Sequence, residues 1–249
     1  MRRARRSAYG RPPTTNAYSG TVSDWARHLP LSNRPRRDES AVTGDRSAAT
    51  AAVLTALADV LTARPDLLMA DTAHADVTVD RALRIALTRM RWSRWQRLLA
   101  VVGVVDAPSD ELAALDTAAL PEILRVEAAA RTSNERPTSV QALSEVVVVA
   151  LDIAARHTVP LTVDPHDLGA VALDLALRVP TERRAVLTAR AMRSVDGGWQ
   201  VGAGRPLYAT SADIVLFLAG RGGIPDELPE PEPRTRRPRD DEDEDDYEA

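Results

Sequence analysis

The segment from Ser139 to Arg156 constrains the fold more than any other part of the chain, because it is almost uninterrupted in apolar residues. Its four consecutive valines, Val146 to Val149, would also suit a buried strand. The alanine- and leucine-rich flanks make the segment longer than a strand usually is, so we predict a helix. Glu145 and Asp152 lie in it seven residues apart and therefore share one face.

Other segments show apolar residues at helical spacing or the alternation of strands. The predicted helices are Ser47–Ala63, Asp80–Val102, Pro121–Ala130, Asp164–Arg178 and Ser211–Leu218, the last with Ser211 as its cap. The predicted strands are Ala185–Met192, Trp199–Val201 and Leu207–Ala209. This order predicts a mainly α fold, in which a four-helix bundle is followed by a small α+β domain.

Charge is distributed very unevenly along the chain. Residues 1–37 hold nine arginines and one acid, a net charge of +8, whereas residues 226–249 hold twelve acids and four arginines, a net charge of −8. Such charge runs resist packing into a core. We expect a basic, mostly irregular extension at 1–46, the bundle at 47–160, the α+β domain at 161–223 and an acidic disordered tail at 224–249.

The composition excludes several kinds of chemistry. The chain has no cysteine, which excludes disulfides, thiolate metal sites and a cysteine nucleophile. All 32 basic residues are arginine, which excludes Schiff-base and phosphate-loop lysines. No apolar run is long enough to span a membrane, and no apolar signal segment follows the basic N-terminal region. We therefore expect a cytoplasmic protein without membrane contact.

Histidines and arginines give weaker signals. His28, His74, His157 and His166 lack the one-turn pairing of metal ligands on a helix, so we interpret each as a surface or helix-capping residue. The Asp80–Val102 segment carries six arginines spread around the helix, a pattern typical of a salt-bridged face. We expect Glu145 to face the bundle interior and to pair with one of these arginines, since a buried carboxylate needs a partner.

Two segments resemble the mycothiol-dependent maleylpyruvate isomerase family of actinobacteria, which has a DinB-like four-helix bundle and a small C-terminal domain. Residues 131–154, RTSNERPTSVQALSEVVVVALDIA, are similar to the last helix of that bundle. Residues 195–223, VDGGWQVGAGRPLYATSADIVLFLAGRGG, are similar to the second domain. Glu145 matches a metal-binding glutamate of the family, but the two histidine positions fall near Ile85 and on Val149, which cannot bind metal. The resemblance therefore implies a divergent, metal-free member.

The resemblance also implies a site between the two domains for mycothiol or a small acid. Its candidate catalytic residues are Glu145 as a vestigial carboxylate, Asp152 as a helix-orienting partner and Arg221 as an anion anchor. Two alternatives stay open: a transferase with a metal-independent thiol site, and a non-catalytic interaction protein. In the second, the basic end would bind nucleic acid or an acidic partner, and the acidic tail would compete for that surface or bind the basic end itself. The sequence does not decide whether the protein is an enzyme.

Overall fold

The computed structural model describes residues 44–74, 76–91, 112, 114–133 and 137–231, all of which fall within one compact unit. The helices of its first half are α3 (Ser47–Ala63), the short η1 (Pro65–Met69), α4 (Val79–Met90), the short η2 (Thr117–Ala119), α7 (Leu120–Thr132) and α8 (Val140–His157). The second half contains α9 (Pro165–Arg178), α10 (Thr181–Ala189), β1 (Arg190–Ser194), β2 (Gln200–Gly202), β3 (Arg205–Ala209) and α11 (Ser211–Ala219).

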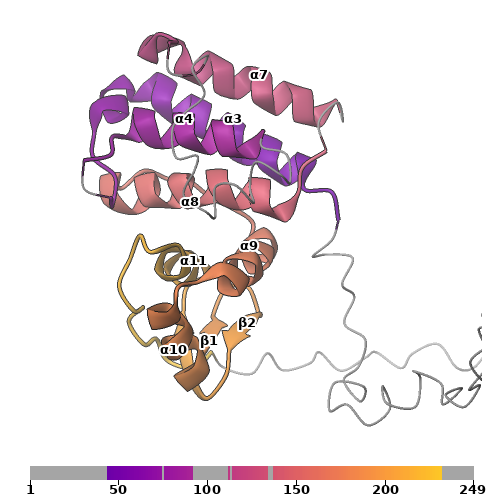
Figure 1. Ribbon diagram of the computed structural model, residues 1–249, viewed down its shortest axis with the longest axis vertical. Coiled ribbons are helices and arrows are strands. Elements are labelled where there is room, and N and C mark those ends of the chain that lie inside the picture. The colour runs from indigo at the N-terminus through magenta and orange to yellow at the C-terminus, as the bar shows by residue number, and fades with distance from the viewer. Residues whose placement is uncertain (1–43, 75, 92–111, 113, 134–136, 232–249) are drawn as a thin grey trace, which may run out of the picture. The chain divides into compact units, whose positions relative to one another are not determined.

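Helices α3, α4, α7 and α8 form a bundle (Figure 1). In it α3 packs against α7, α4 packs against α8, and α3 also contacts α8. The small three-stranded sheet and its helices follow, which confirms the predicted mainly α fold with a bundle followed by an α+β part. Part of the helix predicted to reach Val102 lies outside the described residues, because α4 is described only to Met90.

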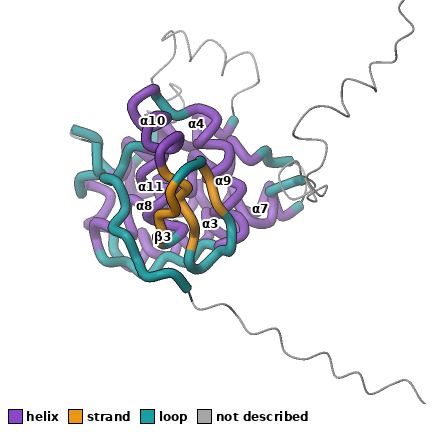
Figure 2. Tube along the Cα trace, turned by 90° about the horizontal axis from the view of Figure 1, so that it is seen from below, coloured by secondary structure: helices purple, strands orange, loops and turns teal. Residues whose placement is uncertain are grey.

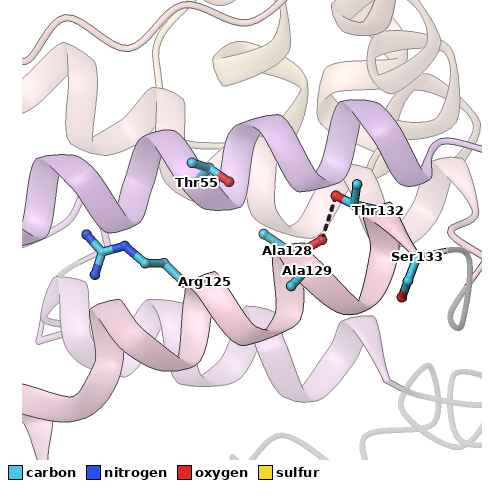
Figure 3. A pocket seen from close by; sticks show the side chains of 6 residues that line it. All are labelled: Thr55, Arg125, Ala128, Ala129, Thr132 and Ser133. Atoms are coloured by element: carbon cyan, nitrogen blue, oxygen red, sulfur yellow. Dashed lines mark hydrogen bonds between the residues drawn. The ribbon is translucent and has the colours of Figure 1, made fainter.

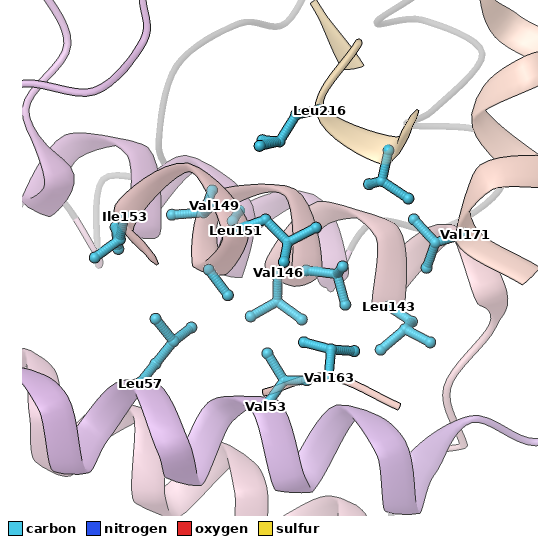
Figure 4. Close-up of a cluster of buried hydrophobic side chains, with 14 of the residues drawn as sticks. Val53, Leu57, Leu143, Val146, Val149, Leu151, Ile153, Val163, Val171 and Leu216 are labelled. Carbon is cyan, nitrogen blue, oxygen red and sulfur yellow. The ribbon is translucent and has the colours of Figure 1, made fainter. Parts of the chain in front are cut away.

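Helix α8 is apolar nearly all round because protein packs on two of its sides. Figure 4 shows Val53 and Leu57 of α3 below α8 and Leu216 of α11 above it. Ser139 caps the helix, as its hydroxyl accepts a hydrogen bond from the backbone N–H of Ala142 at 3.3 Å. The bundle and the α+β part therefore share one central helix, and their cores are continuous through it.

The predicted strand at Ala185–Met192 is wrong over most of its length. Helix α10 occupies Thr181–Ala189, and the strand begins only at Arg190. Figure 2 shows the strands beside the helices. Strand β1 lies in the middle of the sheet, antiparallel to β2 and parallel to β3. Where helix gives way to strand is thus set by pairing with segments further along the chain, which local composition does not reveal.

Only two residues, Ala203 and Gly204, connect β2 to β3, which lie on opposite sides of β1. The chain must therefore cross the beginning of β1 in a very tight turn. Gly202 has a φ of +85°, and a Cβ atom there would collide with the carbonyl oxygens of Leu187 and Arg190. Glycine is required at this position because other residues strongly disfavour the conformation and would not fit the space.

The start of α11 also differs from the prediction. Thr210, not Ser211, is the cap, and its hydroxyl accepts a hydrogen bond from the Asp213 backbone N–H at 3.1 Å. Ser211 is fully buried inside the first turn and donates to Asp196 at 2.6 Å. Its hydroxyl therefore ties the helix to the turn that follows β1 instead of capping the helix.

The predicted N-terminal extension lies almost wholly outside the described residues, and so does most of the acidic tail. The first residues of that tail are described, and the backbone N–H of Leu228 donates to the carbonyl oxygen of Tyr208 on β3 at 2.8 Å. Within the described ranges, no helix has both the length and the apolar character needed to cross a membrane.

Candidate functional site

The structure brings together two of the three site residues expected from the sequence. Asp152 on α8 is almost fully buried, and Nη1 of Arg221 lies 3.1 Å from its Oδ2 atom. Both carboxylate oxygens of Asp152 also accept from the backbone N–H of Ala73 at 3.1 Å. Arg221 Nη1 is 3.3 Å from the hydroxyl oxygen of Thr72 as well. The ion pair therefore joins α8 of the bundle to the segment after α11, and the loop before α4 contacts both of its members.

Local structure explains why Arg221 reaches this position. Helix α11 ends at Gly220, which takes a left-handed conformation with a φ of 76°. The backbone N–H of Arg221 then donates to the carbonyl oxygen of Leu216 at 2.8 Å and closes the helix end. The guanidinium of Arg183 lies against Gly220, where a Cβ atom would overlap it. Because Gly220 has no side chain, the guanidinium of Arg183 can lie against the same chain segment that carries Arg221.

We call the residues Thr72, His74, Asp152, Arg183 and Arg221 the seam site, and their electrostatics favour an anion. Burial lowers the pKa of Arg221, and the nearby positive charge of Arg89 lowers it further, while Asp152 and Glu145 act in the opposite direction. Burial also lowers the pKa of His74, assisted by the charges of Arg221 and Arg183 and opposed by Asp152. The imidazole is therefore neutral at neutral pH and retains a proton-accepting nitrogen.

Glu145, the third expected residue, lies at the edge of this region. Its Oε2 atom is 3.5 Å from Nη1 of Arg89 on α4, so its partner comes from the expected helix. Its side chain is 24% exposed, and the expected position in the bundle interior is wrong. The arginine that pairs with Asp152 does not come from that helix but from the segment after α11.

The positions aligned with metal-binding histidines do not fit a metal. Val149 is buried in the core and Ile85 is half-buried, and neither side chain carries a donor atom. Within the described ranges, no group of three or more histidine, aspartate or glutamate side chains could hold a metal ion. That the protein is metal-free stays a prediction.

A shallow groove of about 510 Å³ lies elsewhere, between α3 and α7 (Figure 3). It is lined by small side chains and Arg125. Nη2 of Arg125 already donates to Asp59 at 3.2 Å and to Thr62 at 2.9 Å. The groove therefore offers a ligand few unengaged polar groups, and it is a weaker candidate than the seam site.

Sequence reasoning missed three members of the seam site, namely Thr72, His74 and Arg183. His74 has no histidine partner one turn away, so the metal-ligand criterion set it aside. Arg183 is one of many arginines, and only the fold brings its side chain to Gly220. The one local signal was the helix stop at Gly220 followed by Arg221, which places an arginine at a helix end.

The fold and the seam site together define a bundle protein whose central helix joins a small α+β part through a buried arginine–aspartate pair. No family model matches the chain, and no protein of curated function matches it. Two solved structures are similar to it, the mycothiol-dependent maleylpyruvate isomerase and a histidine-to-alanine mutant of that enzyme. They share 14% and 17% identity respectively, each with a TM-score of 0.41, and the match covers 78% of this chain and 95% of theirs. This is a distant likeness of arrangement, and it transfers no activity.

Proposed function

We propose that this chain is a divergent, metal-free relative of the maleylpyruvate isomerase family that binds a small organic acid or a thiol cofactor such as mycothiol at the seam site. The proposal rests mainly on Arg221, whose guanidinium is held 3.1 Å from Asp152 where two parts of the fold meet. Ligand sites commonly form at such junctions. Glu145 takes no part in binding metal in this proposal and serves to orient Arg89.

The charge balance supports an acidic ligand. Arg89, Arg156, Arg183 and Arg221 carry four positive charges, whereas Glu145 and Asp152 carry two negative ones. A carboxylate or thiolate would compensate the excess positive charge. The Asp152 contact holds the Arg221 side chain in place, which lowers the entropy that a ligand must remove on binding.

His74 gives this site a group that can move a proton. Its side chain reaches solvent but is partly desolvated, and its lowered pKa leaves it unprotonated at neutral pH. A neutral imidazole beside an arginine clamp can accept the proton of a bound thiol, which the arginines then hold as the thiolate. If the protein is catalytic, we propose that His74 serves as its base and that Arg183 and Arg221 hold the anion.

Calorimetric titration with mycothiol and with small mono- and dicarboxylates tests the proposal. We expect binding by the full chain and a loss of roughly 10- to 100-fold in affinity for Arg221→Met, the effect of removing a charge-assisted hydrogen bond. Arg125→Met is a matched control, because Arg125 also pairs with an aspartate but lies in the groove between α3 and α7. Equal affinity for both variants, or no binding of any of these ligands, would contradict the proposal.

The charge runs support a second candidate, a non-catalytic interaction protein. The net charges of +8 over residues 1–37 and −8 over residues 226–249 favour binding to partners of opposite charge. Such binding would weaken steeply with added salt and would survive Arg221→Met. Pull-down of nucleic acid and of acidic peptides across a salt series separates this candidate from the seam site.

A further inference from the structure

A second buried arginine lies at the start of α3, away from the seam site. The backbone N–H of Arg46 donates to the carbonyl oxygen of Thr138 at 2.9 Å, and the N–H of Thr138 donates to Asp45 at 3.0 Å. These two bonds tie the start of α3 to the start of α8. Arg46 Nη1 also lies 2.8 Å from Oδ1 of Asp167 in the first turn of α9, so the starts of three helices meet at Arg46.

The rest of the Arg46 guanidinium has no partner among the described residues. Arg46 is only 8% exposed, and its Nε and Nη2 atoms are buried without a hydrogen bond. These two atoms lie on the same edge of the guanidinium, the edge that holds a carboxylate or phosphate through two parallel bonds. One turn along α3, the hydroxyl of Thr50 is also buried without a hydrogen-bond partner. A buried charged donor left without an acceptor is costly.

We propose that Nε and Nη2 of Arg46 bind a small oxyanion, such as inorganic phosphate, sulfate or a carboxylate. The partial positive charges at the starts of α3, α8 and α9 favour an anion at this place. The carboxylates of Asp45 and Asp167 oppose it, but both are already engaged. Asp45 accepts from Ser47 and Thr138, and Asp167 pairs with Nη1 of Arg46. An oxyanion presents two oxygens at the spacing of the free edge and therefore accepts from both N–H groups through two parallel bonds.

Arg46→Lys is the sharpest variant for testing this site. A lysine retains the positive charge opposite Asp167 but lacks the two-donor edge. The matched control is Arg64→Lys, because Arg64 lies just after the other end of α3 in an exposed pair with Asp66. Both changes are made in the full chain carrying Arg221→Met, so that anion binding at the seam site does not contribute. The proposal for the seam site is tested separately by the calorimetric titration, so a failure of one proposal is distinguishable from a failure of the other.

The measurement is the thermal unfolding midpoint at rising phosphate, sulfate or acetate, with chloride at equal ionic strength as reference. We expect a saturable rise for the Arg221→Met chain and for the Arg64→Lys control. For Arg46→Lys the apparent affinity should fall by roughly 10- to 100-fold, corresponding to one lost charge-assisted hydrogen bond. The acetate arm distinguishes a planar carboxylate from the tetrahedral anions.

A rise that is the same in the Arg46→Lys chain, or no saturable rise at all, would overturn the proposal. If Arg46→Lys does not fold, selenate soaked into crystals of the unmodified protein gives an independent answer. An anomalous selenium peak within hydrogen-bonding distance of Nε and Nη2 supports the site. Ordered water alone at these two atoms refutes it.

Discussion

Helix α8 carries one carboxylate near its beginning and one near its end, and the two have very different surroundings. Glu145 is 24% exposed and lies 3.5 Å from one half-exposed arginine of α4. Asp152 is 3% exposed and contacts Arg221 and the backbone N–H of Ala73, each at 3.1 Å. Both residues lie on one helix, two turns apart, in equally apolar sequence.

The difference shows that a carboxylate's role depends on what covers its helix at that turn. At Asp152 the loop before α4 and the segment after α11 close over the helix and remove water, which strengthens each charged contact. At Glu145 solvent remains, so the contact with Arg89 is screened. Four predictions test this contrast, from the largest expected effect to the smallest.

Asp152→Asn should lower the free energy of unfolding by about 3 kcal/mol, because Arg221 and the Ala73 N–H lose a buried negative acceptor. Urea denaturation of the full chain measures the loss. Arg221→Met in the same chain should restore a large part of it, since the buried positive charge is then removed as well, and Arg156, which also pairs with Asp152, is half-exposed. A loss below about 1 kcal/mol for the single variant would mean that this end of α8 is as well solvated as the other.

Gly220→Ala should lower the free energy of unfolding by about 1 kcal/mol, because alanine disfavours the positive φ and its Cβ overlaps Arg183. The change should also displace Arg221 and weaken ligand binding at the seam site. Gly223→Ala is the control, as a Cβ atom there has no neighbour within 4 Å. Equal stability of the two variants in thermal and urea unfolding would contradict the described end of α11.

Stability should also depend on pH through His74. Burial and the neighbouring arginines lower its pKa below the usual 6.5, so the unfolded chain binds the proton more readily. The contribution of this group is complete above about pH 6.5 and is lost as the pH falls through the folded-state pKa. Arg221→Met should raise the pKa of His74 and Glu145→Gln should leave it unchanged, as read from the ring-proton signals in NMR titrations. A pKa of His74 above 6.5 in the unmodified protein would contradict this prediction, because His74 would then stabilise the fold at low pH instead of at high pH.

Glu145→Gln should have the smallest effect, a loss of at most about 0.5 kcal/mol, because the pair with Arg89 is partly exposed. A double-mutant cycle with Arg89→Met should give a coupling energy of similar size. The urea midpoint of each variant, compared with that of Asp152→Asn, measures the contrast directly. A loss above about 1.5 kcal/mol would indicate that Glu145 lies in the bundle interior, as the sequence predicted.

The sequence by itself determined the elements whose signals are local. Helix α3 follows its apolar periodicity over Ser47–Ala63, and α8 begins at Val140, one residue after the start expected at Ser139. These features act within a few residues, so composition and spacing reveal them. The resemblance drawn from residues 131–154 and 195–223 correctly predicted a bundle followed by a small α+β part.

Only the tertiary structure decided which segments meet. The helix-to-strand change at Arg190 depends on pairing with β2 and β3, and the Asp152–Arg221 pair joins residues 69 positions apart. The exposure of Glu145 and the free edge of Arg46 likewise depend on neighbours from other elements. Periodicity shows which face of a helix is apolar, but it does not specify which distant segment packs over a given turn. The burial of a charged side chain and the charges around it depend on that segment.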